Sequence, residues 1–172
     1  MLIVFSGLPG TGKTTIARGL VSRTQAMYLR IDTIEQAIRN SRVLAEDVGS
    51  SGYQVANQVA LSNLDLGNSV IVDCVNPVHD SREAWSDIAR RADVHLINIQ
   101  VICSDTREHR RRVENRTSDV AGLISPTWQS VTNHEYEAWG EPPFTVDTAR
   151  LSAADAVAKL IEQFFYIAIP EN

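Results

Sequence analysis

Residues 7–14 carry glycines, a lysine and a threonine at a spacing that could hold phosphate groups. The stretch GLPGTGKT fits the pattern G-x-x-x-x-G-K-[ST] and lies between an apolar run and an amphipathic stretch. Glycines let backbone N–H groups turn inward around an anion at the start of a helix. The residues predicted to bind the phosphates are Gly7, Leu8, Pro9, Gly10, Thr11, Gly12, Lys13, Thr14 and Thr15. Among them, Lys13 is also predicted to draw charge from the γ-phosphate and Thr14 to bind Mg²⁺.

The scarcity of lysine indicates which nucleotide the loop would hold. Fourteen of the sixteen basic residues are arginine, and the two lysines are Lys13 and Lys159. Guanine-specific proteins normally read the base with an N/T-K-x-D segment, and no lysine lies where such a segment could be. We therefore expect ATP as the nucleotide.

Two aspartates follow apolar runs and could complete a phosphate-transfer site. Asp73 ends VIVD, and an apolar run followed by aspartate typically holds Mg²⁺, usually through water. If its strand neighbours the first strand, Asp73 comes close to Thr14. Asp32 follows LRI and is a second acidic candidate. The alternatives are a helix cap or turn residue for Asp73 and the N-cap of the following helix for Asp32.

Five arginines lie within ten residues in the stretch TREHRRRVENR (106–116). Arg112 and Arg116 stand four residues apart and share one face of the expected helix. Arg116, at the entrance to the next loop, is predicted to stabilise the charge that builds up on a transferring phosphoryl group. The other three, Arg107, Arg110 and Arg111, are expected on a solvated face where Glu108 and Glu114 pair with some of them.

Short apolar runs that alternate with helical patterns must position these residues. Strands are expected at 2–6, 26–31, 69–75, 94–103 and 144–146. Helices are expected at 13–24, 33–40, 53–67, 81–92, 106–116 and 152–165. This order predicts an α/β protein with a parallel sheet, helices on both faces and ligands at the carboxyl ends of the strands. We expect one domain over 1–172, with a lid at about 117–128.

Composition excludes some classes of function. The net charge of −5 argues against a general nucleic-acid coat or an anionic membrane surface. No apolar stretch approaches the ~20 residues that span a bilayer. Cys74 and Cys103 follow strand-like runs and fit buried, reduced thiols, so a cytoplasmic location is expected.

Aromatic residues late in the chain are expected to serve packing. Trp128, Tyr136 and Trp139 could wall a substrate pocket, but packing under the lid is the favoured interpretation. The apolar tail FFYIAI (164–169) is expected to cap the core rather than form a partner surface.

These segments together resemble small P-loop kinases. More narrowly, the chain is similar to the AAA-labelled kinases related to chloramphenicol phosphotransferase, zeta toxin and the polynucleotide kinase domain. The resemblance rests on FSGLPGTGKTTIARGL, RIDTIEQAI, SVIVDCVNP, CSDTREHRRRVENR and FTVDTA. It implies a three-layer α/β/α P-loop NTPase fold whose five-stranded parallel sheet has the order 2-3-1-4-5. That order would bring Asp73 beside the phosphate loop.

The resemblance also implies roles for single residues. Asp32 matches the aspartate that orients or deprotonates the acceptor hydroxyl, and Arg112 and Arg116 match the paired arginines before the lid. Thr148 and Ala149 would border the adenine. The chain lacks the second acid of polynucleotide kinases, the Asp-x-Leu-His segment of gluconate kinases and the glycine triplet of shikimate kinases. No acceptor is therefore named.

The leading hypothesis is an ATP- and Mg²⁺-dependent phosphotransferase that acts on a hydroxyl of a small molecule. One alternative is a polynucleotide 5′-hydroxyl kinase with a basic track that includes Arg30, Arg39 and Arg42. Another is a nucleotide-binding regulatory protein without a transfer acceptor. The sequence indicates no oligomeric state.

Overall fold

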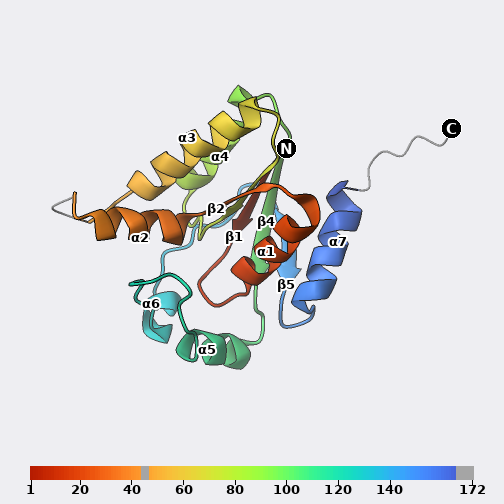
Figure 1. Ribbon diagram of the computed structural model, residues 1–172. Coiled ribbons are helices and arrows are strands. Elements are labelled where there is room, and N and C mark those ends of the chain that lie inside the picture. The colour runs from red at the N-terminus through yellow and green to blue at the C-terminus, as the bar shows by residue number, and fades with distance from the viewer. Residues whose placement is uncertain (44–46, 166–172) are drawn as a thin grey trace.

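Five parallel strands form one sheet of order β2-β3-β1-β4-β5 in a computed structural model, which describes residues 1–43 and 47–165 (Figure 1). The strands are β1 (Leu2–Ser6), β2 (Met27–Arg30), β3 (Val70–Asp73), β4 (Leu96–Ile102) and β5 (Phe144–Asp147). The helices are α1 (Lys13–Thr24), α2 (Ile31–Ser41), α3 (Ser51–Asp65), α4 (His79–Arg91), α5 (Thr106–Glu114), α6 (Trp128–Thr132) and α7 (Ala153–Phe165). The predicted fold and strand order are confirmed.

The central strand β1 is buried along its whole length, which explains its unbroken apolar sequence LIVF. It pairs with β3 on one side and β4 on the other, with Leu2 opposite both Val70 and Leu96. The carboxyl end of β1 therefore lies between β3 and β4. Phe5 is level with Asp73, so the predicted metal-binding aspartate stands directly beside the start of the phosphate loop.

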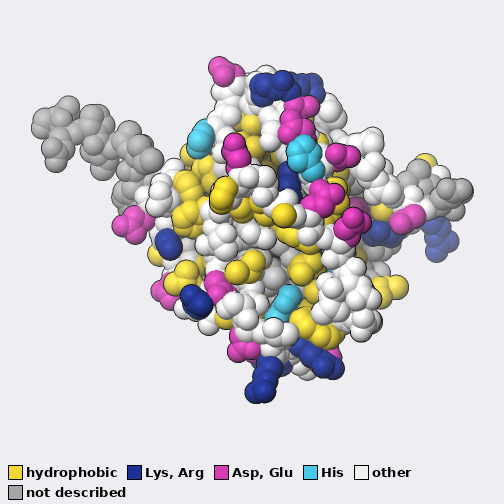
Figure 2. All heavy atoms as spheres, turned by 180° about the vertical axis from the view of Figure 1, so that it is seen from behind, with side chains coloured by type: hydrophobic (Ala, Val, Ile, Leu, Met, Phe, Trp, Pro, Cys, Tyr) yellow, Lys and Arg dark blue, Asp and Glu magenta, His cyan; other side chains and the backbone are white. Residues whose placement is uncertain are grey.

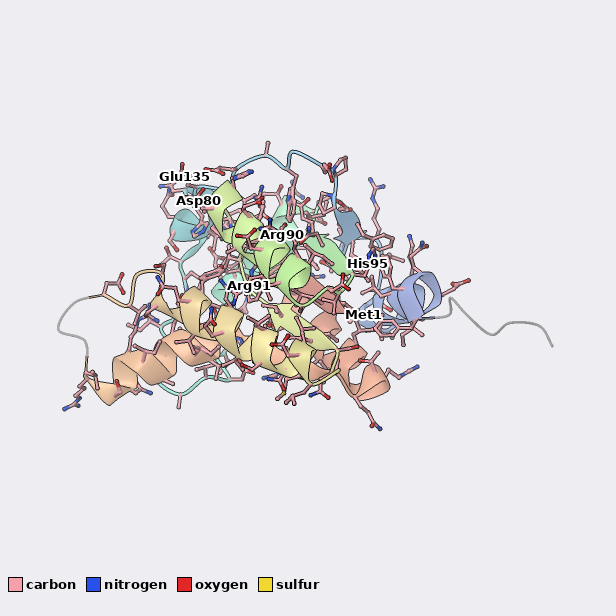
Figure 3. The ribbon with its side chains drawn as sticks, turned by 90° about the horizontal axis from the view of Figure 1, so that it is seen from above. Met1, Asp80, Arg90, Arg91, His95 and Glu135 are labelled. Atoms are coloured by element: carbon pink, nitrogen blue, oxygen red, sulfur yellow. The ribbon has the colours of Figure 1, made fainter. Side chains whose placement is uncertain are left out.

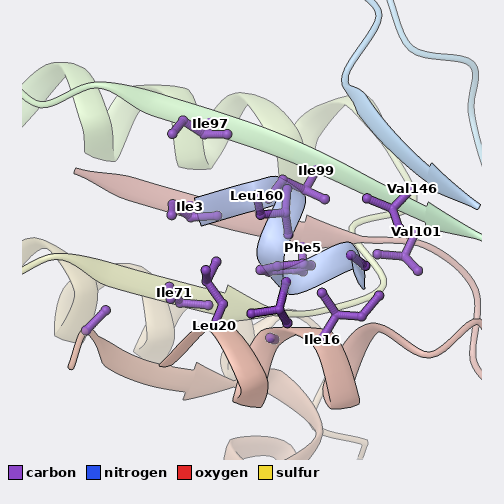
Figure 4. Close-up of a cluster of buried hydrophobic side chains, with 14 residues drawn as sticks. Ile3, Phe5, Ile16, Leu20, Ile71, Ile97, Ile99, Val101, Val146 and Leu160 are labelled. Atoms are coloured by element: carbon purple, nitrogen blue, oxygen red, sulfur yellow. The ribbon is translucent and has the colours of Figure 1, made fainter. Parts of the chain in front are cut away.

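Alternate residues of β1 point into two separate apolar cores, one on each face of the sheet. Ile3 and Phe5 face α1 and α7, where Ile16, Leu20 and Leu160 cover them (Figure 4). On the other face Leu2 and Val4 pack with residues of α3 and α4. Among these are Ala56, Ala60, Trp85 and Ile88. The two helical layers hold the carboxyl ends of the strands in a fixed arrangement.

One helix start differs from the prediction. Helix α2 begins at Ile31 with Arg30 as its N-cap residue, so the alternative interpretation of Asp32 as the cap of this helix is wrong. The chain passes from β2 into α2 without an intervening loop, which places Asp32 inside the first turn. There its charge is favoured by the positive end of the helix dipole.

Other ends follow local sequence signals. The hydroxyl of Ser152, the residue before α7, accepts a hydrogen bond from the Asp155 N–H at 3.1 Å and so caps this helix. The short helix α6, which we did not predict, begins after Thr127, whose hydroxyl accepts from the Ser130 N–H. None of the described helices is long and apolar enough to cross a bilayer.

The end of α7 covers part of the first core. Phe164 and Phe165 pack against that cluster, whereas the rest of the apolar tail predicted to cap it, residues 166–169, lies outside the described residues. Cys74 and Cys103 are buried and not bonded to one another, as expected for reduced thiols.

The segment after α6 is held against α4 by Arg82. This buried guanidinium donates hydrogen bonds to four backbone carbonyls, those of Asn76, Pro77, Glu137 and Ala138. It also lies over the rings of Trp139 and Tyr136, at 4.1 and 5.1 Å. Figure 3 shows α4 from above, with Asp80 in its first turn and Arg90 and Arg91 in its last. Trp139 and Tyr136 thus pack on Arg82.

Candidate active site

The phosphate loop connects β1 to α1 in a conformation that only glycine adopts readily. Gly7, Gly10 and Gly12 have φ angles of 134°, 83° and 99°. A Cβ atom on Gly7 would lie 2.2 Å from the Val101 carbonyl oxygen, and one on Gly10 would lie 2.5 Å from a methyl group of Val113. Close packing and backbone geometry therefore both require these glycines.

Lys13 folds back into this loop. Its ammonium group donates to the Leu8 carbonyl oxygen at 3.0 Å, and the residue is only 8% exposed. Burial lowers the pKa of Lys13, while the charges of Asp73 and Asp32 oppose that shift. The cation is thus within electrostatic reach of both predicted carboxylates.

Asp73 is buried at the end of β3 and is held by a residue that the sequence analysis missed. The hydroxyl of Tyr28, on β2, donates to Asp73 Oδ2 at 2.8 Å. Arg30 Nε lies 3.9 Å from the same oxygen. Burial, together with the Asp73 charge, raises the pKa of Tyr28, so this hydroxyl stays protonated and acts as a donor.

Asp32 stands at the meeting point of two arginines from distant parts of the chain. Its Oδ2 is 3.4 Å from Arg30 Nη2 and 3.8 Å from Arg116 Nη2. The first turn of α2 supplies the carboxylate, and the segment just after α5 supplies Arg116. The structure thus brings together two residues that were predicted separately to act at the reacting phosphate.

Asp119 forms a second acidic bridge that the sequence analysis did not identify. Its two carboxylate oxygens bind different arginines, Oδ1 to Arg30 Nη1 at 2.8 Å and Oδ2 to Arg18 Nη2 at 2.6 Å. The hydrogen bond from Arg30 holds the pKa of Asp119 at about 2. The segment after α5 is therefore tied to both α1 and β2.

These groups surround one cavity of about 660 Å³. Predicted site residues in its wall are Pro9, Gly10, Gly12, Lys13, Thr14, Thr15, Asp32, Asp73, Arg112 and Arg116. Further lining residues that were not predicted as site residues include Arg18, Arg30, Arg111, Asp119, Leu123 and Ile124. The wall of this cavity thus combines residues of the phosphate loop with ion-paired side chains and apolar residues of the segment after α5.

A smaller cavity of about 280 Å³ adjoins the first and shares Gly12, Thr15 and Arg112 with it. Thr148 lines its far side, and Arg112 Nη1 donates to the Thr148 hydroxyl at 2.8 Å. That hydroxyl in turn donates to the Thr11 carbonyl at 2.7 Å. The loop after β5 is thereby attached to both the phosphate loop and α5.

Not every predicted residue lines these two cavities. Gly7, Leu8, Thr11 and Ala149 are absent from both walls. The first three belong to the phosphate loop. Gly7 allows its turn, and the carbonyl groups of Leu8 and Thr11 accept hydrogen bonds from Lys13 and Thr148.

The arginines of α5 divide as the sequence suggested. Arg110 pairs with Glu114 and Arg111 with Glu108, at 2.8 and 2.7 Å. Arg112 also binds Glu108, at 2.8 Å. Hydrogen bonds from Arg111 and Arg112 hold the pKa of Glu108 at about 2. Arg111 nevertheless reaches the cavity wall, which the sequence did not suggest.

Helix α5 also contacts the phosphate loop through a histidine. The buried His109 ring nitrogen Nε2 lies 2.8 Å from the Pro9 carbonyl oxygen. Trp128 packs edge-on against the same ring, with 5.2 Å between centroids. His109 and Pro9 are 100 residues apart in the sequence, so no local pattern indicated this contact.

A family model described as an AAA domain matches residues 2–123. The chain belongs to this AAA domain family. The match runs from β1 through the phosphate loop, both predicted aspartates, α5 and Asp119. It ends before α6 and β5, so the Thr148 side of the smaller cavity lies beyond it.

Two curated proteins are similar to this chain in sequence. The uncharacterized protein Rv2004c of Mycobacterium tuberculosis is 32% identical in an alignment of length 124 that covers 61% of this chain. The match spans only 23% of the length of that relative. The guanylate kinase of Ruegeria pomeroyi is 25% identical in an alignment of length 185 that covers 94% of this chain and 84% of the relative.

Solved structures share the fold along almost the whole chain. Kti12 of Chaetomium thermophilum in complex with ADP-AlF3 has a TM-score of 0.72 at 22% identity, covering 96% of this chain and 97% of that one. The APS kinase CysC of Mycobacterium tuberculosis in complex with AMPPNP and APS has 0.68 at 17%, covering 94% and 96%. A gluconokinase of Sinorhizobium meliloti 1021 has 0.62 at 18%, covering 95% of each. The AAA domain therefore has a P-loop kinase-like fold.

The predicted metal residues Thr14 and Asp73 carry oxygen atoms, which are the ligand type that Mg²⁺ takes. Thr14 and Asp73 line the same cavity, and Tyr28 orients one oxygen of Asp73. Within residues 1–43 and 47–165, no group of three or more His, Cys, Asp or Glu residues could hold a metal. Mg²⁺ in phosphate-transfer sites typically uses one or two protein oxygens together with phosphates and water.

Proposed function

We propose that this AAA domain is an ATP- and Mg²⁺-dependent phosphotransferase that moves the γ-phosphate to a hydroxyl of a small molecule. One observation carries the proposal: a single cavity joins the phosphate loop, Asp73, Asp32 and Arg116. Holding a nucleotide requires only the first of these, whereas transfer also requires groups for the acceptor and for the charge on the moving phosphate. Structural neighbours with ADP-AlF3 and with AMPPNP and APS support the proposal.

The nucleotide would lie across the two cavities. Backbone N–H groups of residues 7–15 would hold its phosphates at the start of α1. The smaller cavity would take the adenine, bordered by Arg112 and Thr148, with Ala149 nearby. Lys13 would exchange the Leu8 carbonyl, its partner at 3.0 Å, for β- and γ-phosphate oxygens.

Thr14 and Asp73 would hold Mg²⁺ at the phosphate end of the main cavity. Bound Mg²⁺ supplies charge neutralisation between the β- and γ-phosphates. Tyr28 would keep the Asp73 carboxylate in one orientation, and burial beside Phe5 would limit its exposure to water.

Asp32 would orient the acceptor hydroxyl and accept its proton. The hydroxyl oxygen forms a bond to the γ-phosphorus as the bond from that phosphorus to the bridging oxygen breaks, and ADP leaves. Lys13 and Arg116 would stabilise the negative charge on the equatorial oxygens during this step. The 3.8 Å distance between Arg116 Nη2 and Asp32 Oδ2 supports a role for both residues at one reacting centre.

We further propose that residues 1–172 form one domain and that the segment at about 117–128 acts as its lid. Leu123, Ile124 and Pro126 line the cavity from this segment. Ile124 is 90% exposed, and closure of the segment over the cavity would bury it. Closure would exclude water from the transferring phosphate.

Replacement of Asp32 tests the proposal. Asp32→Asn should lower ATP-dependent phosphorylation of an acceptor, found by screening a metabolite panel, by roughly 10²- to 10⁴-fold, the usual contribution of a general base. Binding of the ATP analogue AMPPNP should stay near the wild-type level.

Asp80→Asn is the matched control, because Asp80 also lies in the first turn of a helix but is fully exposed on α4. Transfer that persists near the wild-type rate in Asp32→Asn would remove Asp32 as the base. Nucleotide binding without turnover across the whole panel would instead favour a regulatory nucleotide-binding protein.

A further inference from the structure

Arg30 is an unusual cation because it is buried in the wall of the 660 Å³ cavity, beside Asp32, the residue proposed to orient the acceptor. Its side chain is only 3% exposed, and it lines the cavity beside Asp32. Nη2 faces Asp32 and Nη1 binds Asp119, while Nε has no hydrogen-bond partner among the described residues. A buried guanidinium requires anionic partners, so whatever fills this end of the cavity must satisfy Arg30.

Asp119 is the partner of Arg30 that can be replaced. Asp73 ends a strand and Asp32 lies in a helix, whereas Asp119 belongs to the irregular segment between α5 and α6. Its side chain is 42% exposed, although it binds two arginines at once. A segment that moves as a lid would withdraw this carboxylate.

The arrangement around Asp119 is that of an oxyanion site. Arg18, from α1, and Arg30, from the end of β2, each bind a different oxygen of one carboxylate. Two arginines that converge on one group from separate elements are a geometry suited to carboxylate or phosphate. When the phosphate loop is filled, Lys13 and Arg116 would be engaged there, and Arg18 and Arg30 would remain for a second anion.

We propose that the phosphate acceptor is a small hydroxylated anion whose carboxylate or phosphate group binds Arg18 and Arg30 in place of Asp119. This inference rests on the proposed transfer function. Because Asp119 and Asp32 occupy the two terminal nitrogens of one guanidinium, the acceptor's anionic group lies next to its reacting hydroxyl. Leu123 and Ile124 also line this cavity, whose volume of about 660 Å³ suits a small molecule.

Binding of three matched probes tests the inference without turnover. Glycerate, glycerol 3-phosphate and glycerol share a carbon skeleton and differ in anionic group. Each is titrated by calorimetry in the presence of saturating ADP and Mg²⁺, so that the phosphate loop is already filled. Asp119→Asn removes the competing charge and should bind at least one of the two anions about tenfold more tightly than wild type, with no change for glycerol.

Two variants serve as comparisons. Arg18→Gln changes a half-exposed side chain outside the apolar cores. This variant should bind the anions about tenfold more weakly than wild type. Asp87→Asn removes another arginine-paired aspartate, on α4 away from the cavity, and should behave as wild type.

The results separate this inference from the proposed function. Equal binding of both anions by wild type and Asp119→Asn, or binding of glycerol as strong as that of the anions, overturns the anionic-acceptor inference while transfer itself can stand. Failure of the protein to bind ADP removes the proposed function instead. Preference between glycerate and glycerol 3-phosphate then assigns carboxylate or phosphate.

Discussion

At the scale of single residues, the two catalytic carboxylates proposed here differ in how they are held. Asp73 is buried and receives a hydrogen bond from Tyr28, whereas Asp32 is partly exposed and faces Arg30 and Arg116. A fixed carboxylate suits a metal ion that needs defined geometry, and an accessible one suits an exchanging acceptor.

The hydroxyl of Tyr28 therefore has a testable role in positioning Asp73. Tyr28→Phe removes a hydrogen bond worth about 1 kcal/mol, and we expect a roughly fivefold rise in the Mg²⁺ concentration for half-maximal activity. Tyr136→Phe is the control, since the buried Tyr136 hydroxyl has no hydrogen-bond partner among the described residues. An unchanged Mg²⁺ requirement in Tyr28→Phe would show that the tyrosine does not position the metal carboxylate.

Acid should weaken the contribution of Asp119 to stability. Its pKa is about 2 in the folded protein, against about 3.9 in an unfolded chain, so the contribution is complete above pH ~4 and is lost as the pH falls toward ~2. Urea unfolding of wild type and Asp119→Asn across this range should show a gap in unfolding free energy that closes with acid. A gap that stays constant with pH would contradict the prediction.

At the scale of secondary-structure elements, α5 supports the phosphate loop as much as it supplies arginines. Val113 packs where a Gly10 side chain would lie, and His109 contacts the Pro9 carbonyl oxygen at 2.8 Å. The loop is therefore pressed between α5 and the sheet, which fixes its backbone before a nucleotide binds. Such preorganisation lowers the cost of ordering the loop around phosphate.

Substitution at Gly10 tests this contact. Gly10→Ala adds a methyl group 2.5 Å from Val113 at a φ of +83°, so we expect nucleotide affinity to fall by at least about tenfold. Gly140→Ala is the control, because a Cβ atom there meets nothing within 4 Å. Val113→Ala in the Gly10→Ala background removes the clashing methyl and should restore part of the affinity, as isothermal calorimetry can measure. No recovery would mean that backbone strain alone causes the loss.

The elements and the phosphate loop were predictable because their signals are local. The glycine spacing at residues 7–12 and the alternation of apolar runs with helical patterns lie within short windows of sequence. The strand order came from the resemblance to P-loop kinases, and the structure confirms it. The five-residue helix α6 was missed because so short a helix carries almost no periodic signal.

The acceptor end of the cavity was not predictable from the same patterns. Asp119 binds Arg30, which is 89 residues away in the sequence. An aspartate in a polar loop has no local feature that predicts such a partner. Tyr28 likewise looked like an ordinary strand residue, although it binds Asp73 45 residues away. The sequence left open that Asp32 caps its helix, because it does not show that β2 runs directly into α2.

At the scale of the whole molecule, the distribution of charge disfavours a nucleic-acid acceptor. The basic track that this alternative requires is interrupted, because Arg30 is buried among carboxylates and Arg39 faces Glu35 and Asp47. On the face opposite to Figure 1, Lys and Arg side chains are mixed with Asp and Glu rather than gathered in one band (Figure 2). The net charge of −5 adds a general repulsion.

A single-stranded oligonucleotide with a 5′-hydroxyl should therefore bind weakly. We expect fluorescence anisotropy to give a dissociation constant no tighter than about 10⁻⁴ M at physiological salt, the weak end of non-specific binding. The same titration at low salt serves as the comparison. Micromolar binding with a steep dependence on salt would revive the polynucleotide kinase alternative.

The central position of β1 has a consequence for the synthesis of the protein. During synthesis this strand leaves the ribosome before its neighbours β3 and β4, which begin at Val70 and Leu96. The phosphate loop after β1 also depends on both neighbours. The Gly7 N–H donates to the Val75 carbonyl, just after β3, and Gly7 packs closely against the Val101 carbonyl of β4. A nascent chain must therefore carry this apolar strand unpaired until β3 has been made. A nucleotide that binds the loop can favour folding only after β4 has also left the ribosome.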